Sequence, residues 1–445
     1  MEKLRLLLAH NGPYVPAHDG ANKANRCLME GLAARGHECI ALLHVSPPSH
    51  PRTTAQFGAE VLRAGGSELV VQDGALTSHL NGVGIRAYEP LGGSSEQRNL
   101  FLRDCLLRTT DRFAPDLIIS SCSDSGGTFL RAALDSGRPV VHQARCTAML
   151  GVGPAAFAVD WEMGALLRRT HKIIANSRYM QRYLRDFANV GSEVLDLPTY
   201  DRPSLVPDRY DHAEYITMVN PCQVKGLPIL LEVARRCGHL KFAAVATWGI
   251  TPDDRAALAQ QGNITVLPPS DDINTLLRRT RVLLVPSLWH EAFGRIVVEA
   301  LLSGVPVLSS DSGGLPEAKL GVPPAPIPVR PIERYDAVFD ERGVPRVRVP
   351  EQDIDPWVDA LIRLVSERPW YEHVAQRSHA AAIEYVDSLS IEKAERLLLS
   401  CQGARTGDVR TGEQDLHDLL LRLSPARRSY LLHLLGRAEA AVEAG

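Results

Sequence analysis

The sequence predicts an α/β protein, because short apolar, β-branched runs alternate with longer helical patterns from one end to the other. The chain has 445 residues, about three times the roughly 150 residues of one domain, so two or three domains are expected. The apolar runs have the length of buried strands in parallel sheets. Together these observations favour two doubly wound domains facing each other, with ligands bound at the carboxyl ends of the strands in an interdomain cleft.

The first half of the chain is expected to form one such domain. A helix is predicted over 21–35, and it is expected to end there because Gly36 follows. Buried strands are predicted over 4–9, 39–45, 117–120, 140–142 and 173–176.

The second half repeats the same order of elements after a polar stretch, 201–212, that lacks helical or strand periodicity. Segment 322–350 is rich in Pro and Arg and is expected to be a loop, and helices are expected after residue 351. Helices are also predicted over 227–236 and 294–303, and strands over 216–219, 242–246, 264–267, 282–286 and 305–309. The expected domains are 1–205 and 206–385, followed by a helix that crosses back over 386–410 and a helical hairpin over 411–445.

Charge and composition exclude several classes of protein. Lys and Arg number 49 and Asp and Glu number 52, which gives a net charge of −3 and disfavours nucleic acid as a partner. No apolar run reaches the roughly 18 residues of a membrane span, and the opening segment lacks a signal-peptide pattern, so a cytoplasmic protein is expected. The eight cysteines are scattered singly, which disfavours a disulfide framework or a zinc site.

The last segment, 411–445, has leucines on one face of two helical patterns that are separated at Ser424-Pro425. Two interpretations stay open. The hairpin caps the core, or it forms a surface for a homo-oligomer or another partner.

The most informative segment runs from a predicted strand ending at Pro286 through an acidic loop to a helix that opens at Gly294. A glycine and a helix amino end, which carries about half a positive charge, form a cradle for phosphate. Glu291 at this cradle is suited to accept hydrogen bonds from sugar hydroxyls. Glu299 lies about two helical turns further on, so it projects from the same face and is placed for a ribose diol.

This arrangement resembles the Glu-x7-Glu signature of retaining glycosyltransferases with the GT-B fold, most closely glycosyltransferase family four. The resemblance implies that Glu291 contacts the donor hexose, that Ala292-Phe293-Gly294 holds the phosphates, and that Glu299 binds the nucleotide ribose. An ordinary helix with an acidic amino end is the alternative. The Pro-Ser, Gly-Val-Pro-Val and Gly-Gly-x-Pro-Glu elements around the glutamates favour the family.

Lys225-Gly226 follows the first predicted strand of the second half and precedes a helix. A lysine there is placed to neutralise a diphosphate leaving group. The family carries a second phosphate-binding arginine five residues before the lysine, and this chain has Asn220 at that position. Arg295 is a candidate for the missing charge, with an exposed helix arginine as the alternative.

Gly20 lies in the loop that resembles the glycine loop of the family, and its backbone amide is expected to reach the donor phosphates from the first domain. A plain turn glycine is the alternative. Near the acceptor the family places a histidine, and both His142 and Arg145 compete for this role. Ser121, Ser123 and Asp124 either line the same cleft or cap the helix that begins near residue 125.

Asp353-Ile354-Asp355 is the one Asp-x-Asp in the chain, and Pro356 after it indicates a helix start with Asp355 as N-cap, rather than a metal site. No metal and no cofactor are expected.

The resemblance implies a hexosyltransferase that moves a sugar from a UDP- or GDP-type donor with retention. Arginines outnumber lysines by 42 to seven, as in GC-rich bacterial genomes, which favours a small-molecule acceptor in secondary metabolism. A GT-B nucleotide-sugar epimerase and a non-catalytic nucleotide-sugar-binding or docking protein are the alternatives.

Overall fold

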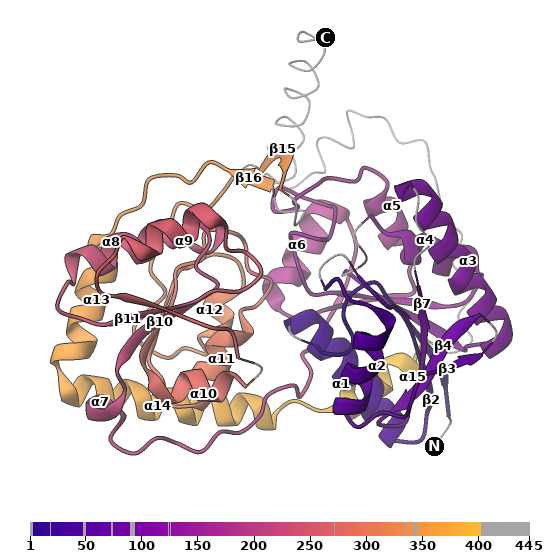
Figure 1. Ribbon diagram of the computed structural model, residues 1–445, viewed down its shortest axis with the longest axis horizontal. Helices are drawn as coiled ribbons and strands as arrows, with labels where there is room; N and C mark the ends of the chain where they lie inside the picture. The colour runs from indigo at the N-terminus through magenta and orange to yellow at the C-terminus, as the bar shows by residue number, and fades with distance from the viewer. Residues whose placement is uncertain are drawn as a thin grey trace, which may run out of the picture.

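The computed structural model describes residues 3–401 except 18, 48–49, 73, 90–93, 123, 125, 271, 334 and 341–344. The predicted hairpin over 411–445 lies outside the described residues. Within the described part of the chain, no helix is long and apolar enough to cross a membrane. Figure 1 shows two lobes side by side, each built around a sheet with helices on both faces.

The N-terminal lobe is built on a sheet that has nine strands among the described residues, in the order β3-β4-β5-β2-β1-β6-β7-β8-β9. The strands from β5 to β9 pair in parallel, while β3, β4 and β5 form an antiparallel meander at one edge. The strands are β1 (Arg5–His10), β2 (Glu38–His44), β3 (Val70–Gln72), β4 (Ala75–Leu80), β5 (Val83–Tyr88), β6 (Leu117–Ser121), β7 (Val140–Ala144), β8 (Lys172–Ala175) and β9 (Glu193–Val194).

Helices cover both faces of this sheet, and two buried apolar clusters lie between the helices and the strands. Leu7 and Ile118 belong to one cluster and Leu6 and Ile119 to the other, because successive strand residues point to opposite faces. The helices are α1 (Gly20–Ala34), α2 (Thr54–Arg63), α3 (Ser95–Phe113), α4 (Thr128–Asp135), α5 (Met163–Arg168) and α6 (Arg178–Ala188).

The C-terminal lobe has an all-parallel sheet, with five strands in the described residues, in the order β12-β11-β10-β13-β14. Its strands are β10 (Tyr215–Val219), β11 (Phe242–Val245), β12 (Ile264–Leu267), β13 (Thr280–Val285) and β14 (Val307–Ser309). Its helices are α7 (Arg209–His212), α8 (Leu227–Arg236), α9 (Pro252–Ala259), α10 (Ile273–Arg279), α11 (Arg295–Leu302), α12 (Leu315–Ala318), α13 (Asp355–Ser366) and α14 (Arg368–Asp387).

The chain returns to the N-terminal lobe after α14, and α15 (Ile391–Leu399) packs against α1 (Figure 1). The Arg35 guanidinium donates to Glu392 and Glu395, each at 2.7 Å, and the Nε2 atom of His37 lies 2.9 Å from Glu395. These buried or half-buried pairs fix α15 to the end of α1.

The expectation of a loop over 322–350 is wrong in part. This segment contains an antiparallel pair, β15 (Tyr335–Phe339) and β16 (Pro345–Val347). Two short strands separated by a few residues carry too little periodicity to be distinguished from a loop.

Candidate functional site between the two lobes

Each sheet has a switch point, a strand whose two neighbours are reached by connections that run in opposite directions along the sheet. This point is β1, between β2 and β6, in the N-terminal sheet and β10, between β11 and β13, in the C-terminal sheet. Ligands of such folds bind at the carboxyl ends of the strands beside this point. The candidate residues follow these strand ends in both lobes.

Lys225 and Glu291 meet at the carboxyl edge of the C-terminal sheet. Lys225 ends a short 3-10 turn after β10, and Glu291 lies in the loop after β13. The Lys225 Nζ and Glu291 Oε1 atoms are 2.5 Å apart, and the Ser287 hydroxyl donates to the same oxygen at 2.7 Å. The Lys225 ammonium also lies 3.9 Å from the centre of the Trp289 ring. The side chains of Lys225 and Glu291 are 17% and 13% exposed, so this pair is partly open to solvent and to a ligand.

Two glycines bring these loops together. Gly226 has φ +91°, and a Cβ there would lie 2.0 Å from the Pro286 carbonyl oxygen. Gly313 has φ +67°, and a Cβ there would lie 2.3 Å from the Glu291 carbonyl oxygen. A side chain at either position would push the loop after β13 away from its neighbour, so both glycines are required for the position of Glu291.

The predicted phosphate cradle begins at Gly294, which has φ +107° and precedes α11 without any side-chain cap. The uncapped amino end leaves backbone N–H groups for an anion. Of the two residues before it, Phe293 is buried in the core of the C-terminal lobe, while the Ala292 carbonyl accepts a hydrogen bond from the Ser177 hydroxyl of the N-terminal lobe at 2.5 Å.

Glu299 pairs with Arg295 instead of standing free. The Arg295 Nη2 atom donates to Glu299 at 3.0 Å and to the Thr199 carbonyl at 3.0 Å, and the guanidinium lies 4.6 Å from the centre of the Tyr200 ring. A Cβ at Gly20 would lie 2.6 Å from Arg295 Cδ. Arg295 therefore packs closely against Gly20, and the expected contact of the Gly20 amide with the donor phosphates stays a prediction. The alternative of an exposed helix arginine is wrong, because Arg295 spans the two lobes.

Asn220 has φ +57°, in the left-handed region that Asn tolerates better than Arg. Its Oδ1 atom accepts from the Gly249 N–H at 2.9 Å, and its Nδ2 atom has no partner within the described residues. The side chain is neutral and bound to the loop after β11, so Asn220 brings no cation to the site.

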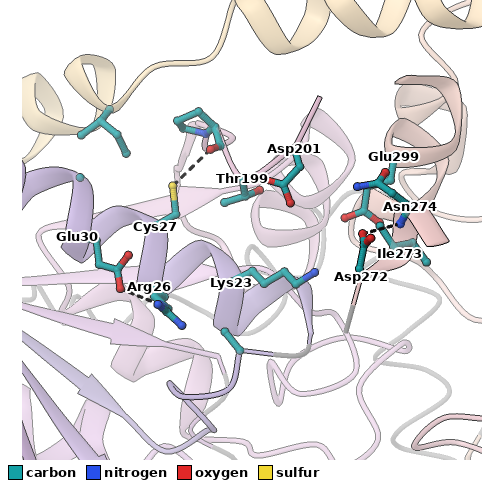
Figure 2. Close-up of a pocket in the computed structure, with 14 residues that line it drawn as sticks. Lys23, Arg26, Cys27, Glu30, Thr199, Asp201, Asp272, Ile273, Asn274 and Glu299 are labelled. Atoms are coloured by element: carbon teal, nitrogen blue, oxygen red, sulfur yellow. Dashed lines mark hydrogen bonds and ion pairs between the residues drawn. The ribbon is translucent and has the colours of Figure 1, made fainter. Parts of the chain in front are cut away.

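The interdomain segment, residues 195–208, joins β9 to α7. A cavity of about 710 Å³ opens between α1, this segment and the C-terminal lobe (Figure 2). This volume is in the range of small-molecule sites. Glu299 lines it, together with residues that sequence reasoning missed. These are Ala17, Lys23, Arg26, Cys27, Glu30, Gly31, Pro198, Thr199, Asp201, Asp272, Ile273, Asn274 and Ile391.

The described acceptor candidates lie at the carboxyl edge of the N-terminal sheet, and all four are buried: Ser121, Asp124, His142 and Arg145. The Arg145 Nε atom donates to Gln143 at 2.9 Å, and its Nη1 atom lies 3.6 Å from Asp196. Gln143 donates to Asn25 of α1 at 2.7 Å, and Asn25 donates to Ser121 at 3.0 Å. Arg145 and Ser121 thus belong to a polar network between α1 and the sheet.

His142 points to the opposite face of the sheet. Its neighbours in alternation, Val140 and Ala144, pack in the cluster that contains Phe129 of α4. Its Nδ1 atom lies 2.9 Å from the Ser120 hydroxyl, and burial lowers its pKa to about 4. Of the two candidates, Arg145 is therefore the one on the side of the interdomain segment.

Asp124 caps α4, as the second interpretation of this segment predicts. Its Oδ2 atom accepts from the N–H groups of Phe129 and Leu130 at 2.7 and 3.0 Å, and burial raises its pKa to about 6. Ser123 lies outside the described residues.

The helix start at the Asp-x-Asp is confirmed, although α13 begins at Asp355 and Ile354 is its N-cap, one residue earlier than expected. Asp355 pairs with Arg236 at 2.5 Å. Within the described residues, no group of three His, Cys, Asp or Glu side chains is placed to hold a metal ion.

Several solved structures share the fold of nearly the whole chain. Sucrose-phosphate synthase from Thermosynechococcus elongatus is 16% identical with a TM-score of 0.64, covering 90% of this chain and 99% of that one. HepE from Anabaena in complex with UDP-glucose is 14% identical with a TM-score of 0.61, covering 89% and 99%. A glycosyltransferase from Rickettsia africae is 13% identical with a TM-score of 0.59, covering 90% and 98%. The chain therefore has the GT-B fold.

Sequence matches then give the family. Residues 19–197 match the family described as "Glycosyl transferase 4-like domain", and residues 215–367 match "Glycosyl transferases group 1". D-inositol 3-phosphate glycosyltransferase from Mycobacterium avium is 33% identical over 165 residues, 35% of this chain and 33% of that protein. The enzyme of the same name from Mycobacterium sp. strain KMS is 28% identical over 184 residues, 40% and 36%. The matches thus span about a third of these curated relatives. The chain belongs to the family-four type of glycosyltransferases.

Proposed function

We propose that this protein is a retaining hexosyltransferase that moves a sugar from a UDP- or GDP-type nucleotide sugar to a small-molecule acceptor. The observation that carries the proposal is the Lys225–Glu291 pair, 2.5 Å apart, at the carboxyl edge of the sheet from which α11 begins without a cap. A cation, a hydrogen-bond acceptor and free backbone N–H groups are the three elements that a sugar diphosphate requires.

The reaction breaks the bond between the anomeric carbon and the phosphate oxygen, and the electron pair goes to the diphosphate. Lys225 and the amino end of α11 stabilise this developing negative charge, which is the largest electrostatic demand of the step. Glu291 accepts hydrogen bonds from the hexose hydroxyls. The acceptor oxygen then bonds to the anomeric carbon on the same face and gives its proton to the leaving phosphate oxygen, so no metal ion and no separate base are needed.

Ligand binding requires a change of partners at both ion pairs. Lys225 exchanges Glu291 for phosphate, and Glu299 exchanges Arg295 for the ribose hydroxyls. The four side chains are only 17%, 13%, 15% and 16% exposed, so the exchange requires that the ligand supply new partners for the separated groups.

We propose a small-molecule acceptor and a role in secondary metabolism. The first curated relatives are named for D-inositol 3-phosphate, which is a small polyol phosphate. We also propose a cytoplasmic location. This proposal is supported by the eight cysteines, all of which are free. We also propose that residues 411–445, which lie outside the described residues, form the contact of a homo-oligomer.

The test incubates the protein with UDP-, GDP- and dTDP-sugars and follows nucleotide release by mass spectrometry, with and without pools of polyols, polyol phosphates and phenols. We expect release that depends on an acceptor and a product whose anomeric configuration, read by NMR, is that of the donor. Changed sugar stereochemistry without any acceptor would favour an epimerase. Nucleotide-sugar binding without release under all conditions would contradict catalysis and favour a binding protein.

A further inference from the structure

The C-terminal lobe offers the donor diphosphate no net positive charge from its paired side chains. Lys225 is paired with Glu291 and Arg295 with Glu299, so each cation is offset by a carboxylate. Asn220 is neutral. A nucleoside diphosphate sugar brings about two negative charges close together, and a partly buried site must offset them. The helix amino end at Gly294 supplies about half a charge, which leaves the balance incomplete.

One side of α1 faces the interdomain segment and the other lobe. Three small residues lie along it: Gly20 against Arg295, Cys27 with its thiol 3.6 Å from the Pro198 carbonyl, and Gly31 against Ile391. Small residues permit the close approach of the helix. Lys23 lies on the same side, three residues after Gly20, and it is the one long cationic side chain on this line of positions.

Lys23 lines the cavity between the lobes, as does Glu299 from the other side. Figure 2 shows its side chain extending from α1 into the space toward the residues of the C-terminal lobe, Asp272 and Glu299. The cavity is therefore bounded by a cation from one lobe and by the predicted ribose ligand from the other.

The Lys23 ammonium has no hydrogen bond or ion pair within the described residues, although carboxylates of Asp201 and Asp272 line the same cavity. Arg26, one turn further along α1, is paired with Glu30 at 2.7 Å. A lysine near the amino end of a helix is also opposed by the helix dipole. Lys23 is therefore a cation that lines the cavity between the lobes and is available to a ligand.

We propose that Lys23 binds the diphosphate of the nucleotide-sugar donor and supplies, from the N-terminal lobe, the positive charge that Asn220 does not bring. The inference rests on the proposed function. Because Lys23 and Lys225 come from different lobes, the diphosphate bridges them, and donor binding favours the arrangement in which the lobes face each other closely.

The experiment measures UDP and GDP binding to the full chain by isothermal titration calorimetry, without acceptor, in wild type, Lys23→Gln, Lys23→Arg and Lys225→Gln. We expect Lys23→Gln to weaken nucleoside diphosphate binding about 10- to 100-fold, as for loss of one charge-assisted hydrogen bond. The same variant should bind uridine or guanosine as wild type does, and Lys23→Arg should restore most of the affinity. Lys241→Gln removes an exposed lysine that pairs with Glu214 far from the cleft, and it should change nothing.

The outcomes separate the two proposals. If Lys225→Gln loses nucleoside diphosphate binding while Lys23→Gln keeps it, the proposed function stands and the role of Lys23 is overturned. If Lys23→Gln weakens the binding of the nucleoside diphosphate and of the nucleoside equally, the role of Lys23 is also overturned, because a structural defect would reduce both affinities. If Lys23→Gln raises only the KM of a phosphorylated acceptor, Lys23 binds the phosphate of the acceptor instead of the donor diphosphate, and the inference is wrong. If wild type binds no nucleotide, both proposals fall.

Discussion

The carboxyl edges of the two sheets carry polar side chains of different character. At the C-terminal edge, Lys225 and Glu291 form a short ion pair that remains partly exposed, 17% and 13%. At the N-terminal edge, Arg145 and Asp196 are buried, with side chains only 3% and 9% exposed. The first pair is open to exchange with a ligand, and the second is enclosed by the fold.

The buried pair belongs to a network that holds segments of the chain together and does not face a ligand site. Asp196 accepts hydrogen bonds from Tyr200 at 3.0 Å and from Tyr385 of α14 at 2.8 Å, in addition to its contact with Arg145. It thus holds the segment that enters the C-terminal lobe and the helix that leaves it. Removing a buried charged group from its partners is costly, whereas a ligand that replaces one partner leaves no charge unpaired. We infer that the chemistry lies at the C-terminal edge, while the N-terminal edge fixes the geometry between the lobes.

The largest expected effect is at the open pair. Lys225→Gln removes the cation that stabilises the leaving diphosphate, so kcat should fall by about 10²- to 10³-fold. Its free energy of unfolding should fall by about 1–3 kcal/mol, because the mostly buried Glu291 loses its cation and keeps the Ser287 hydroxyl as a partner. Initial rates of nucleotide release and urea unfolding measure the two effects. Lys393→Gln, on α15, is the control and should match wild type in both. Turnover of Lys225→Gln within threefold of wild type would contradict the site.

A smaller effect on catalysis, but a large one on stability, is expected at the enclosed pair. Arg145→Met leaves the Asp196 carboxylate buried without its cation, which should lower the free energy of unfolding by about 3–5 kcal/mol. At temperatures where the variant is folded, kcat should stay within about threefold of wild type. Arg108→Met breaks an exposed pair with Asp104 and serves as the control, with a change below about 1 kcal/mol. A 100-fold loss of kcat at unchanged stability would instead make Arg145 catalytic.

The sequence predicted the buried parallel strands and their helices best. Helix α8 occupies the predicted range, 227–236, because Gly226 sets its start and apolar residues recur at helical spacing. The hairpin of β4 and β5 was missed, although its turn, Asn81-Gly82, is a strong hairpin signal and both residues have positive φ. Strands with one polar face lack the continuous apolar run that marks a buried strand.

The roles at the site were less predictable than its location. The motif identified Glu291 and Lys225, but their pairing across 66 positions follows from two neighbouring strand ends. The contact of Arg295 with Thr199 likewise joins residues 96 positions apart. Register places His142 opposite Ser120, and alternation along β7 turns it to the face that packs against Phe129 of α4. No local pattern contains that information, because it depends on which strand lies beside which.

The smallest expected effect is a pH dependence that separates two buried groups of the N-terminal edge. Burial lowers the pKa of His142 to about 4, so between about pH 4 and 6.5 the unfolded chain binds a proton that the folded chain does not, and this group makes stability rise with pH. His142→Asn should remove this contribution, about 1–3 kcal/mol across the window, and flatten the curve. Burial raises the pKa of Asp124 to about 6, so its contribution falls with rising pH, and Asp124→Asn should steepen the curve. Urea unfolding at several pH values measures both slopes. Parallel curves for both variants and wild type would show that neither group is held in its neutral form by the fold.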